Sequence, residues 1–151
     1  MKYLMVDMDG SICEYHDPIG GKITMTEFPS GFFLNKRPLN SIIRIIQEQY
    51  QDYTKIIFSA SPSEESDKEK LQWLQNHGLS DWLHIFLRYP NSDKGQALMT
   101  FMKLNNISPN QVYIIDDDLR VLKSCEKLGV HCLHPSHLLA EYEEKHVAQH
   151  N

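Results

Sequence analysis

The chain has 151 residues and a mass of 17.6 kDa, which is enough for one domain that builds its own hydrophobic core. Hydrophobic residues make up 41% of the sequence and charged residues 23%, a balance typical of a globular protein and unlike that of a disordered chain. The formal net charge of −5 argues against a general polyanion-binding surface, and no apolar stretch approaches the roughly 20 residues of a membrane span.

Short apolar runs alternate with helical patterns along the chain, and this alternation predicts a parallel sheet with crossover helices. The first run, Tyr3–Val6, is short and continuous, as a strand buried on both faces should be. A helix with an apolar face follows from Pro38, and a second buried strand is expected at Lys55–Phe58. The later elements are a helix from Ser63 to Asn76, a strand at 82–87, a helix after Lys94, a strand at 112–115, a helix from Leu119, a strand at 130–133 and a polar helix from Ser136.

Residues 11–38 lack helical periodicity and hold several glycines and prolines. Within them Lys22–Thr26 alternates polar and apolar residues, which predicts a β-hairpin or flap in the interval 12–35. We expect the phenylalanines of this region to pack the flap onto the body, with stacking on a base or sugar as the alternative; they are Phe28, Phe32 and Phe33.

Polar residues follow three of the predicted strands at the point where each strand ends. Asp7 comes directly after the first strand, Ser59 after the second and Asp116 after the strand at 112–115. Because ligands of open α/β sheets bind outside the carboxyl ends of the strands, these side chains are expected in one crevice. Lys94, in a loop before a helix, can reach the same place.

This set of side chains suits phosphoryl transfer. Crowded carboxylates repel one another unless a cation is present, and a hard cation with oxygen ligands, most naturally Mg2+, fits them. One aspartate can then attack phosphorus and form an aspartyl-phosphate. A carboxylate two residues on can protonate the leaving oxygen and later deprotonate the water that releases phosphate. Ser59 and backbone N–H groups would hold the phosphoryl oxygens.

The ordered motifs resemble those of the haloacid dehalogenase (HAD) superfamily of phosphohydrolases. They are Asp7-Met8-Asp9-Gly10-Ser11, then Ser59, then Lys94, then Ile114-Ile115-Asp116-Asp117. The resemblance implies a Rossmann-like three-layer α/β sandwich with a central, mainly parallel sheet, and a Mg2+-dependent phosphatase. It also implies roles for single residues: Asp7 as nucleophile, Asp9 as general acid/base, Ser59 and Lys94 as phosphate ligands, and Asp7, the Asp9 carbonyl and Asp117 as Mg2+ ligands with Asp116 or Asp118 in support.

Three assignments within these motifs stay open. Ser11 stands where the family usually has threonine and keeps the hydroxyl, so it joins the candidates for phosphate binding. The second motif offers Ser61 as an alternative to Ser59. The acidic triplet 116–118 leaves the direct metal ligand undecided among its three members.

Many members of the family carry a cap domain that covers the site. The intervals between Asp7, Ser59 and Lys94 leave no room for a folded cap, so we expect a single domain over residues 1–151 with the flap as a minimal cap. An uncovered site suits a large or extended substrate, or a lid supplied by the partner subunit of a homo-oligomer.

A finer resemblance concerns the substrate. Ser59-Ala60-Ser61-Pro62, together with Lys70, Leu71 and Trp73, looks like the 5′(3′)-deoxyribonucleotidase branch. A nucleotide or nucleic-acid end is therefore the expected substrate, with a sugar phosphate or a protein phosphosite as alternatives. Polynucleotide 3′-phosphatase is a further branch, although the acidic net charge counts against nucleic acid as a partner.

Two other classes of protein compete with an enzyme. A phospho-signalling receiver module also combines acidic residues, a phosphorylated aspartate and a lysine around Mg2+, but the chain order here disagrees. A catalytically idle HAD fold used for binding would have no obvious need for both Asp7 and Asp9. Three cysteines without metal-finger spacing predict reduced thiols in a cytoplasmic protein; they are Cys13, Cys125 and Cys132.

Overall fold

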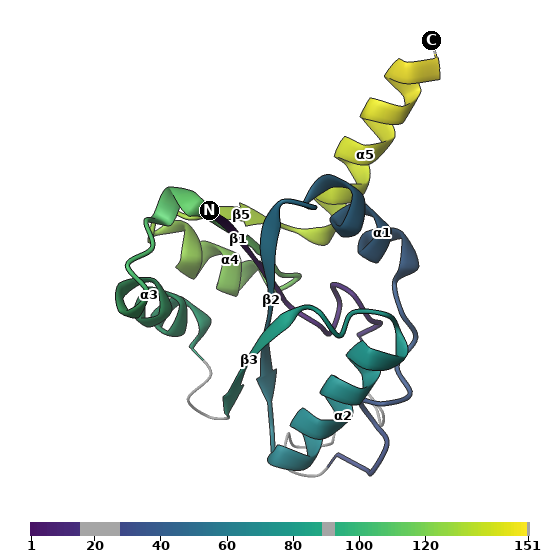
Figure 1. The fold of residues 1–151 in the computed structure, drawn as a ribbon, viewed down its shortest axis with the longest axis vertical. Helices are drawn as coiled ribbons and strands as arrows, with labels where there is room; N and C mark the ends of the chain where they lie inside the picture. Colours follow the sequence, from purple (N-terminus) through teal and green to yellow (C-terminus); the bar gives the residue numbers. More distant parts are fainter. Residues whose placement is uncertain (16–27, 89–92, 151) are drawn as a thin grey trace.

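The computed structural model describes residues 1–15, 28–88 and 93–150, which form an α/β fold with helices on both faces of one sheet (Figure 1). Every pair of neighbouring strands is parallel, in the order β3-β2-β1-β4-β5. The strands are β1 (Lys2–Val6), β2 (Tyr53–Ser61), β3 (Leu83–Arg88), β4 (Val112–Ile115) and β5 (His131–Leu133). This topology confirms the predicted Rossmann-like class.

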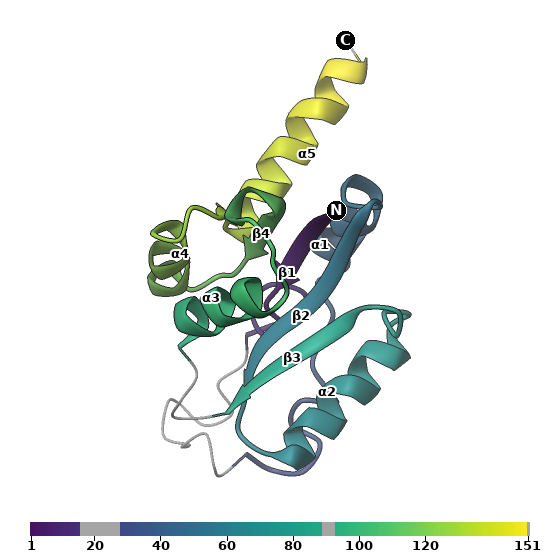
Figure 2. The same ribbon diagram turned by 60° about the vertical axis from the view of Figure 1, so that its left-hand side comes forward.

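The central strands are covered on both faces, because successive residues of a strand point to opposite sides. On β1, Leu4 and Val6 belong to one core cluster and Met5 to the other, and all three side chains are fully buried. The first cluster packs against α1 (Asn40–Gln49), α2 (Glu64–Asn76) and the start of α5 (Pro135–His150), and the second against α3 (Lys94–Leu104) and α4 (Leu119–Glu126) (Figure 2). A short 3-10 turn, η1 (Pro109–Gln111), leads into β4.

The C-terminal helix α5 projects away from the body (Figures 1 and 2). Leu138 in its first turns is fully buried, whereas Val147 near its far end is 60% exposed. Among the helices described, none has the length and apolarity that a bilayer crossing requires. All three cysteines are free thiols, as the sequence predicts.

Strand β2 continues three residues beyond the predicted Lys55–Phe58, because β3 pairs with it along its whole second half. The register joins Ser59 to Phe86 and Ser61 to Arg88, so both serines lie within the strand instead of in the turn that closes it. The prediction that Ser59 follows the end of a strand is wrong in this detail. Its consequence for the site stands, because both serines still lie at the carboxyl end of the sheet.

Lys94 was expected in a loop, and it is instead the first residue of α3. The preceding residue, Asp93, caps the helix by accepting a hydrogen bond from the N–H of Gln96 at 3.1 Å. This cap fixes where the helix starts and therefore holds Lys94 on a rigid element. Ser63 caps α2 in the same way, by accepting a hydrogen bond from the N–H of Ser66 at 3.1 Å.

The predicted hairpin Lys22–Thr26 lies outside the described residues. Of the predicted flap 12–35, the structure describes residues 12–15 and 28–35. Residues 28–38 begin with turns and lie against α2, and we call them the docked segment. Its phenylalanine rings pack on one another with centroids 4.6–5.2 Å apart, which agrees with the predicted packing role. Glu69 of α2 anchors it by accepting hydrogen bonds from the backbone N–H groups of Gly31, Phe33 and Leu34 at 3.0, 3.1 and 3.4 Å.

Candidate active site

Three carboxylates meet at the carboxyl end of the two central strands. Because β1 and β4 are parallel neighbours in register, Asp7 after β1 lies beside Asp116 and Asp117 after β4. The backbone closes the junction, with the N–H of Asp7 donating to the carbonyl of Ile115 at 2.9 Å. One carboxylate oxygen from each aspartate lies within 4.8 Å of the other two. We call these three residues the acidic cluster.

Lys94 bridges two members of the acidic cluster. Its Nζ lies 2.9 Å from Oδ1 of Asp7 and 2.6 Å from Oδ2 of Asp116. Burial by itself would lower the pKa of Lys94, but the two carboxylates outweigh burial and hold that pKa above its ordinary value. The lysine is therefore charged, and it offsets one of three negative charges.

The remaining negative charge is not offset within the cluster. Burial, and then the charge of Asp7, raise the pKa of Asp116 to about 6 and that of Asp117 to about 7. Carboxyl groups that resist ionisation because they are buried next to other carboxylates are a donor set that a hard divalent cation would stabilise.

The loop after β1 is shaped around this cluster. Gly10 has a φ of +84°, a conformation that favours glycine, and a Cβ at this position would collide with the carboxylate of Asp117. The glycine of the Asp-x-Asp-Gly motif is thus required for two reasons: the backbone turn has a positive φ, and the side chain of Asp117 after β4 approaches too closely for a Cβ.

Replacing Asp117 with asparagine is expected to stabilise the metal-free protein. The pKa of Asp117, about 7 when folded, lies above its usual value of 3.8, so the folded state loses stability as the pH rises through that window. At pH 8 the variant should gain about 1 kcal/mol in free energy of unfolding, after allowance for solvent screening of a half-buried carboxyl. Urea unfolding with a chelator measures this gain, which should vanish below pH 4. An Asp117→Asn protein that is no more stable than wild type at pH 8 would count against crowding of charge in the cluster.

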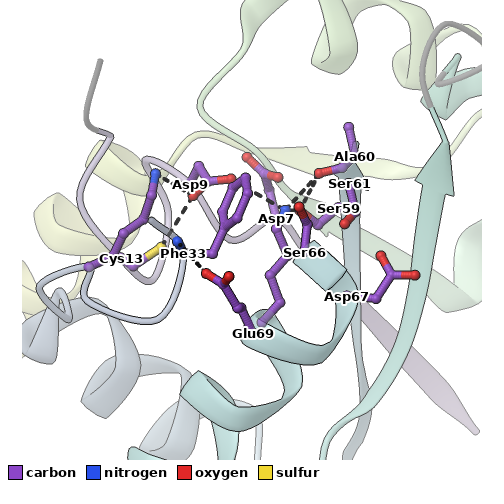
Figure 3. A network of polar contacts seen from close by, with 12 residues as sticks. Asp7, Asp9, Cys13, Phe33, Ser59, Ala60, Ser61, Ser66, Asp67 and Glu69 are labelled. Atoms are coloured by element: carbon purple, nitrogen blue, oxygen red, sulfur yellow. Dashed lines mark hydrogen bonds and ion pairs between the residues drawn. The ribbon is translucent and has the colours of Figure 1, made fainter. Parts of the chain in front are cut away.

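Asp9 lies in a second network of polar contacts, near Cys13 and Phe33 (Figure 3), and two lysines contact its carboxylate. Lys36 Nζ contacts its Oδ1 at 2.7 Å and Lys70 Nζ contacts its Oδ2 at 3.5 Å. The thiol of Cys13 donates to Oδ1 at 3.6 Å. Burial raises the pKa of Asp9, but Lys70 and Lys36 outweigh burial, and the net effect lowers it.

Lys70 connects Asp9 to the candidate phosphate-binding strand. Its Nζ donates to Oγ of Ser59 at 2.9 Å and to the carbonyl of Ala60 at 2.7 Å. Burial lowers the pKa of Lys70, and the charges of Asp9 and Asp7 oppose that effect only in part. Lys70 is therefore close to both aspartates of the Asp-x-Asp motif as well as to Ser59.

Neither Lys36 nor Lys70 was predicted as a site residue. For Lys70 the sequence did contain a signal, because it shares a helical face with Trp73 and Leu74, both of which are buried. A lysine on an apolar face of a helix must find a polar partner inside the fold. Lys36 offers no such signal, since it lies in a segment without periodicity.

The structure separates the alternatives that the motifs left open. Ser59 accepts a hydrogen bond from Lys70, whereas Ser61 lies beside Asp67, whose carboxylate pairs with Arg88 at 2.7 Å. Asp118 caps α4 and pairs with Arg120 at 3.0 Å, so it points away from the acidic cluster.

Ser11 is fully buried, and its hydroxyl has no hydrogen-bond partner within the described part of the chain. The roles assigned to these residues stay predictions, since what the geometry settles is only which of them lie together.

Comparison with known proteins gives a match to solved structures but not to sequences. No family model matches the sequence, and no curated protein matches it significantly. Solved structures do match. A haloacid dehalogenase-like family hydrolase from Streptococcus pneumoniae superposes with a TM-score of 0.63 over 89% of this chain and 84% of its own, at 11% identity. The chain has the haloacid dehalogenase-like fold.

Two further structures share this HAD-like fold. An uncharacterized protein from Listeria monocytogenes serotype 4b gives a TM-score of 0.63 over 89% of this chain and 78% of its own, at 9% identity. A HAD family enzyme from Bacteroides thetaiotaomicron, described as a magnesium complex, gives a TM-score of 0.54 over 89% of this chain and 93% of its own, at 14% identity. These likenesses support the superfamily resemblance at the level of fold and give no support to the deoxyribonucleotidase branch.

Proposed function

We propose that this protein is a Mg2+-dependent phosphomonoester hydrolase that acts through an aspartyl-phosphate on Asp7. The observation that carries the proposal is the position of Asp7, which belongs to the acidic cluster, contacts Lys94 at 2.9 Å and exerts its charge on Lys70. A carboxylate that contacts one cation and acts on a second can meet an anionic phosphate without prohibitive repulsion.

Asp7, Asp117 and Asp116 offer carboxylate oxygens suited to Mg2+, with the backbone carbonyl of Asp9 as the ligand that the HAD resemblance adds. A bound Mg2+ would neutralise negative charge and orient the phosphate. The excess of three carboxylates over one ammonium in the acidic cluster fits a divalent cation in charge as well as in donor type.

The chain's own residues account for both halves of the reaction. Oδ of Asp7 attacks phosphorus, so that an acyl phosphate bond forms and the P–O bond to the leaving group breaks. Lys36 and Lys70 lower the pKa of Asp9, so its carboxylate must take up a proton as the substrate binds before it can act as the acid. Asp9 then gives that proton to the departing oxygen and takes one from water, whose oxygen replaces Asp7 on phosphorus. Lys94 and Ser59 hold the phosphoryl oxygens during both steps.

The first substrates to test are nucleotides and nucleic-acid ends, as the sequence resemblance suggests, followed by sugar phosphates and phosphopeptides. The aromatic rings of the docked segment add apolar surface near Asp9, because the Phe33 ring lies 4.7 Å from the Nζ of Lys70. The acidic net charge of −5 makes a small nucleotide a better first choice than a nucleic-acid end.

Phosphate release from such a panel, with Mg2+ and with a chelator, tests the proposal. We expect turnover of at least one class that requires the divalent cation. Stable phosphorylation of the protein without turnover would instead indicate a receiver-like module. Absence of both phosphorylation and phosphate release across the panel would favour an idle HAD fold used for binding.

A further inference from the structure

The two groups of charged side chains carry opposite excess charges. The acidic cluster sets three carboxylates against the one ammonium of Lys94. Around Asp9 the ratio is reversed, since Lys36 and Lys70 both contact Asp9, and within the described residues no second carboxylate lies within 4.0 Å of either Nζ. The excess in the acidic cluster matches a divalent cation, and the excess beside Asp9 matches an anion.

The ammonium groups of Lys36 and Lys70 are buried, so their positive charge needs a negative partner inside the fold. The side chain of Lys36 is 5% exposed and that of Lys70 is 1% exposed, whereas Asp9 between them is 23% exposed. Aromatic rings lie against the two ammonium groups: the ring centroid of Phe32 is 4.7 Å from Nζ of Lys36, and that of Phe33 is 4.7 Å from Nζ of Lys70. Buried charges are normally paired, and these two ammonium groups contact one carboxylate between them, while the charge of Asp7 also acts on Lys70. Lys36 has no second carboxylate within 4.0 Å among the described residues, so the charge balance beside Asp9 leaves room for a further anion.

Lys36 is held in this position by the fold. Its backbone carbonyl accepts a hydrogen bond from Nε1 of the buried Trp73 at 2.8 Å. Two to five residues earlier, the docked segment is fixed to α2 by the three hydrogen bonds to Glu69. On its other side, Leu39 donates from its N–H to the carbonyl of Ile12 at 2.8 Å, close to Asp9. The backbone on both sides of Lys36 is therefore held in place, so its ammonium group has a defined position that a surface lysine would lack.

We propose that Lys36 and Lys70 form an anion subsite beside Asp9, which binds a second negatively charged group carried by the leaving group of the substrate. This inference rests on the proposed function, because that function makes Asp9 the residue that faces the leaving oxygen. Lys70 also contacts Ser59 and so extends toward the transferring phosphoryl group. Lys36 contacts no residue of the phosphoryl site besides Asp9 and is therefore the residue that selects for the second anion.

The substrate class that fits is a phosphomonoester with a carboxylate or a second phosphate near the ester oxygen. Matched pairs distinguish these sources: 3-carboxyphenyl against 3-carbamoylphenyl phosphate, and 1,3-propanediol bisphosphate against 3-hydroxypropyl phosphate. We expect kcat/KM to be about tenfold or more higher for the anionic member of at least one pair, chiefly through KM, since a hydrogen bond from an ammonium group to an anion is stronger than one to a neutral amide or hydroxyl. The pair that responds identifies the anion.

The variant that tests the subsite is Lys36→Met. It should bring the ratio within each pair to about one, while Lys36→Arg, which keeps the charge, should retain most of the preference. Lys68→Met removes an exposed lysine from the same helix as Lys70 and should leave the ratio unchanged. A wild-type ratio near one in both pairs, or a preference that survives in Lys36→Met, would overturn the subsite.

Binding separates failure of this inference from failure of the proposed function. Calorimetry with 3-carboxybenzylphosphonate and 3-carbamoylbenzylphosphonate, which carry the anion but do not turn over, should show tighter binding of the former, lost in Lys36→Met. If no phosphomonoester is hydrolysed but this binding preference is present, the subsite stands and the hydrolase proposal fails. Thermal unfolding identifies any variant that fails to fold, and the wild-type ratios within the matched pairs then carry the test, since a ratio near one in both pairs overturns the subsite.

Discussion

Asp7→Asn is expected to reduce phosphomonoester turnover by at least about a thousandfold, because the amide cannot serve as the nucleophile that accepts the phosphoryl group. The variant should fold, since it removes one of three crowded carboxylates and leaves Lys94 paired with Asp116 at 2.6 Å. Steady-state kinetics with an aryl phosphate at saturating Mg2+ measure the loss, and circular dichroism checks the fold.

The matched control for this variant is Asp81→Asn, which changes an exposed aspartate before β3. It should keep kcat within about twofold of wild type, as is usual for a surface substitution that alters no partner. Near-normal kcat in the folded Asp7→Asn protein would rule out Asp7 as the nucleophile and, with it, the aspartyl-phosphate.

Asp9→Asn is expected to slow the release of phosphate much more than the phosphorylation of Asp7. Attack by Asp7 on a substrate with a good leaving group needs little help from an acid, so phosphorylation should proceed slowly. Release of phosphate needs a base for the attacking water, and without it the rate should fall by about 10²–10⁴-fold. The phosphorylated protein should therefore accumulate, and mass spectrometry after an acid quench should detect one added phosphoryl group.

The comparison for this experiment is wild-type protein quenched at the same times, in which the phosphorylated form should be sparse. Cys13→Ser serves as a second control, because it alters a neighbour of Asp9 and keeps the carboxylate. A single-turnover profile in Asp9→Asn identical to that of wild type would show that Asp9 takes no part in proton transfer.

The sheet was predictable because its central strands are short apolar runs buried on both faces. Leu4, Met5 and Val6 are fully buried, and such runs cannot be placed elsewhere in a domain of this size. The end of β2 was not predictable, since Ser59 and Ser61 read as a turn and belong to the strand only through pairing with β3. Pairing between distant segments is invisible to local patterns.

The acidic cluster followed from chain order, because Asp7 and Asp116 come directly after two strands that turn out to be parallel neighbours. The two lysines beside Asp9, Lys36 and Lys70, did not follow from the sequence in the same way. Lys36 reaches Asp9 only because Glu69 and Trp73 fix the docked segment on α2, a long-range contact without a local pattern. Lysines in loops are usually solvated, so residue type alone pointed away from the site.

The most direct test of the account is a crystal structure of the protein with Mn2+ and trifluoroberyllate, a mimic of the phosphoryl group. We predict one anomalous peak bound by Asp7 and Asp117 next to Asp116, with beryllium bonded to the remaining carboxylate oxygen of Asp7 and its fluorines within reach of Lys94 and Ser59. A manganese ion bound away from these aspartates, or beryllium bonded to a residue other than Asp7, would contradict the account.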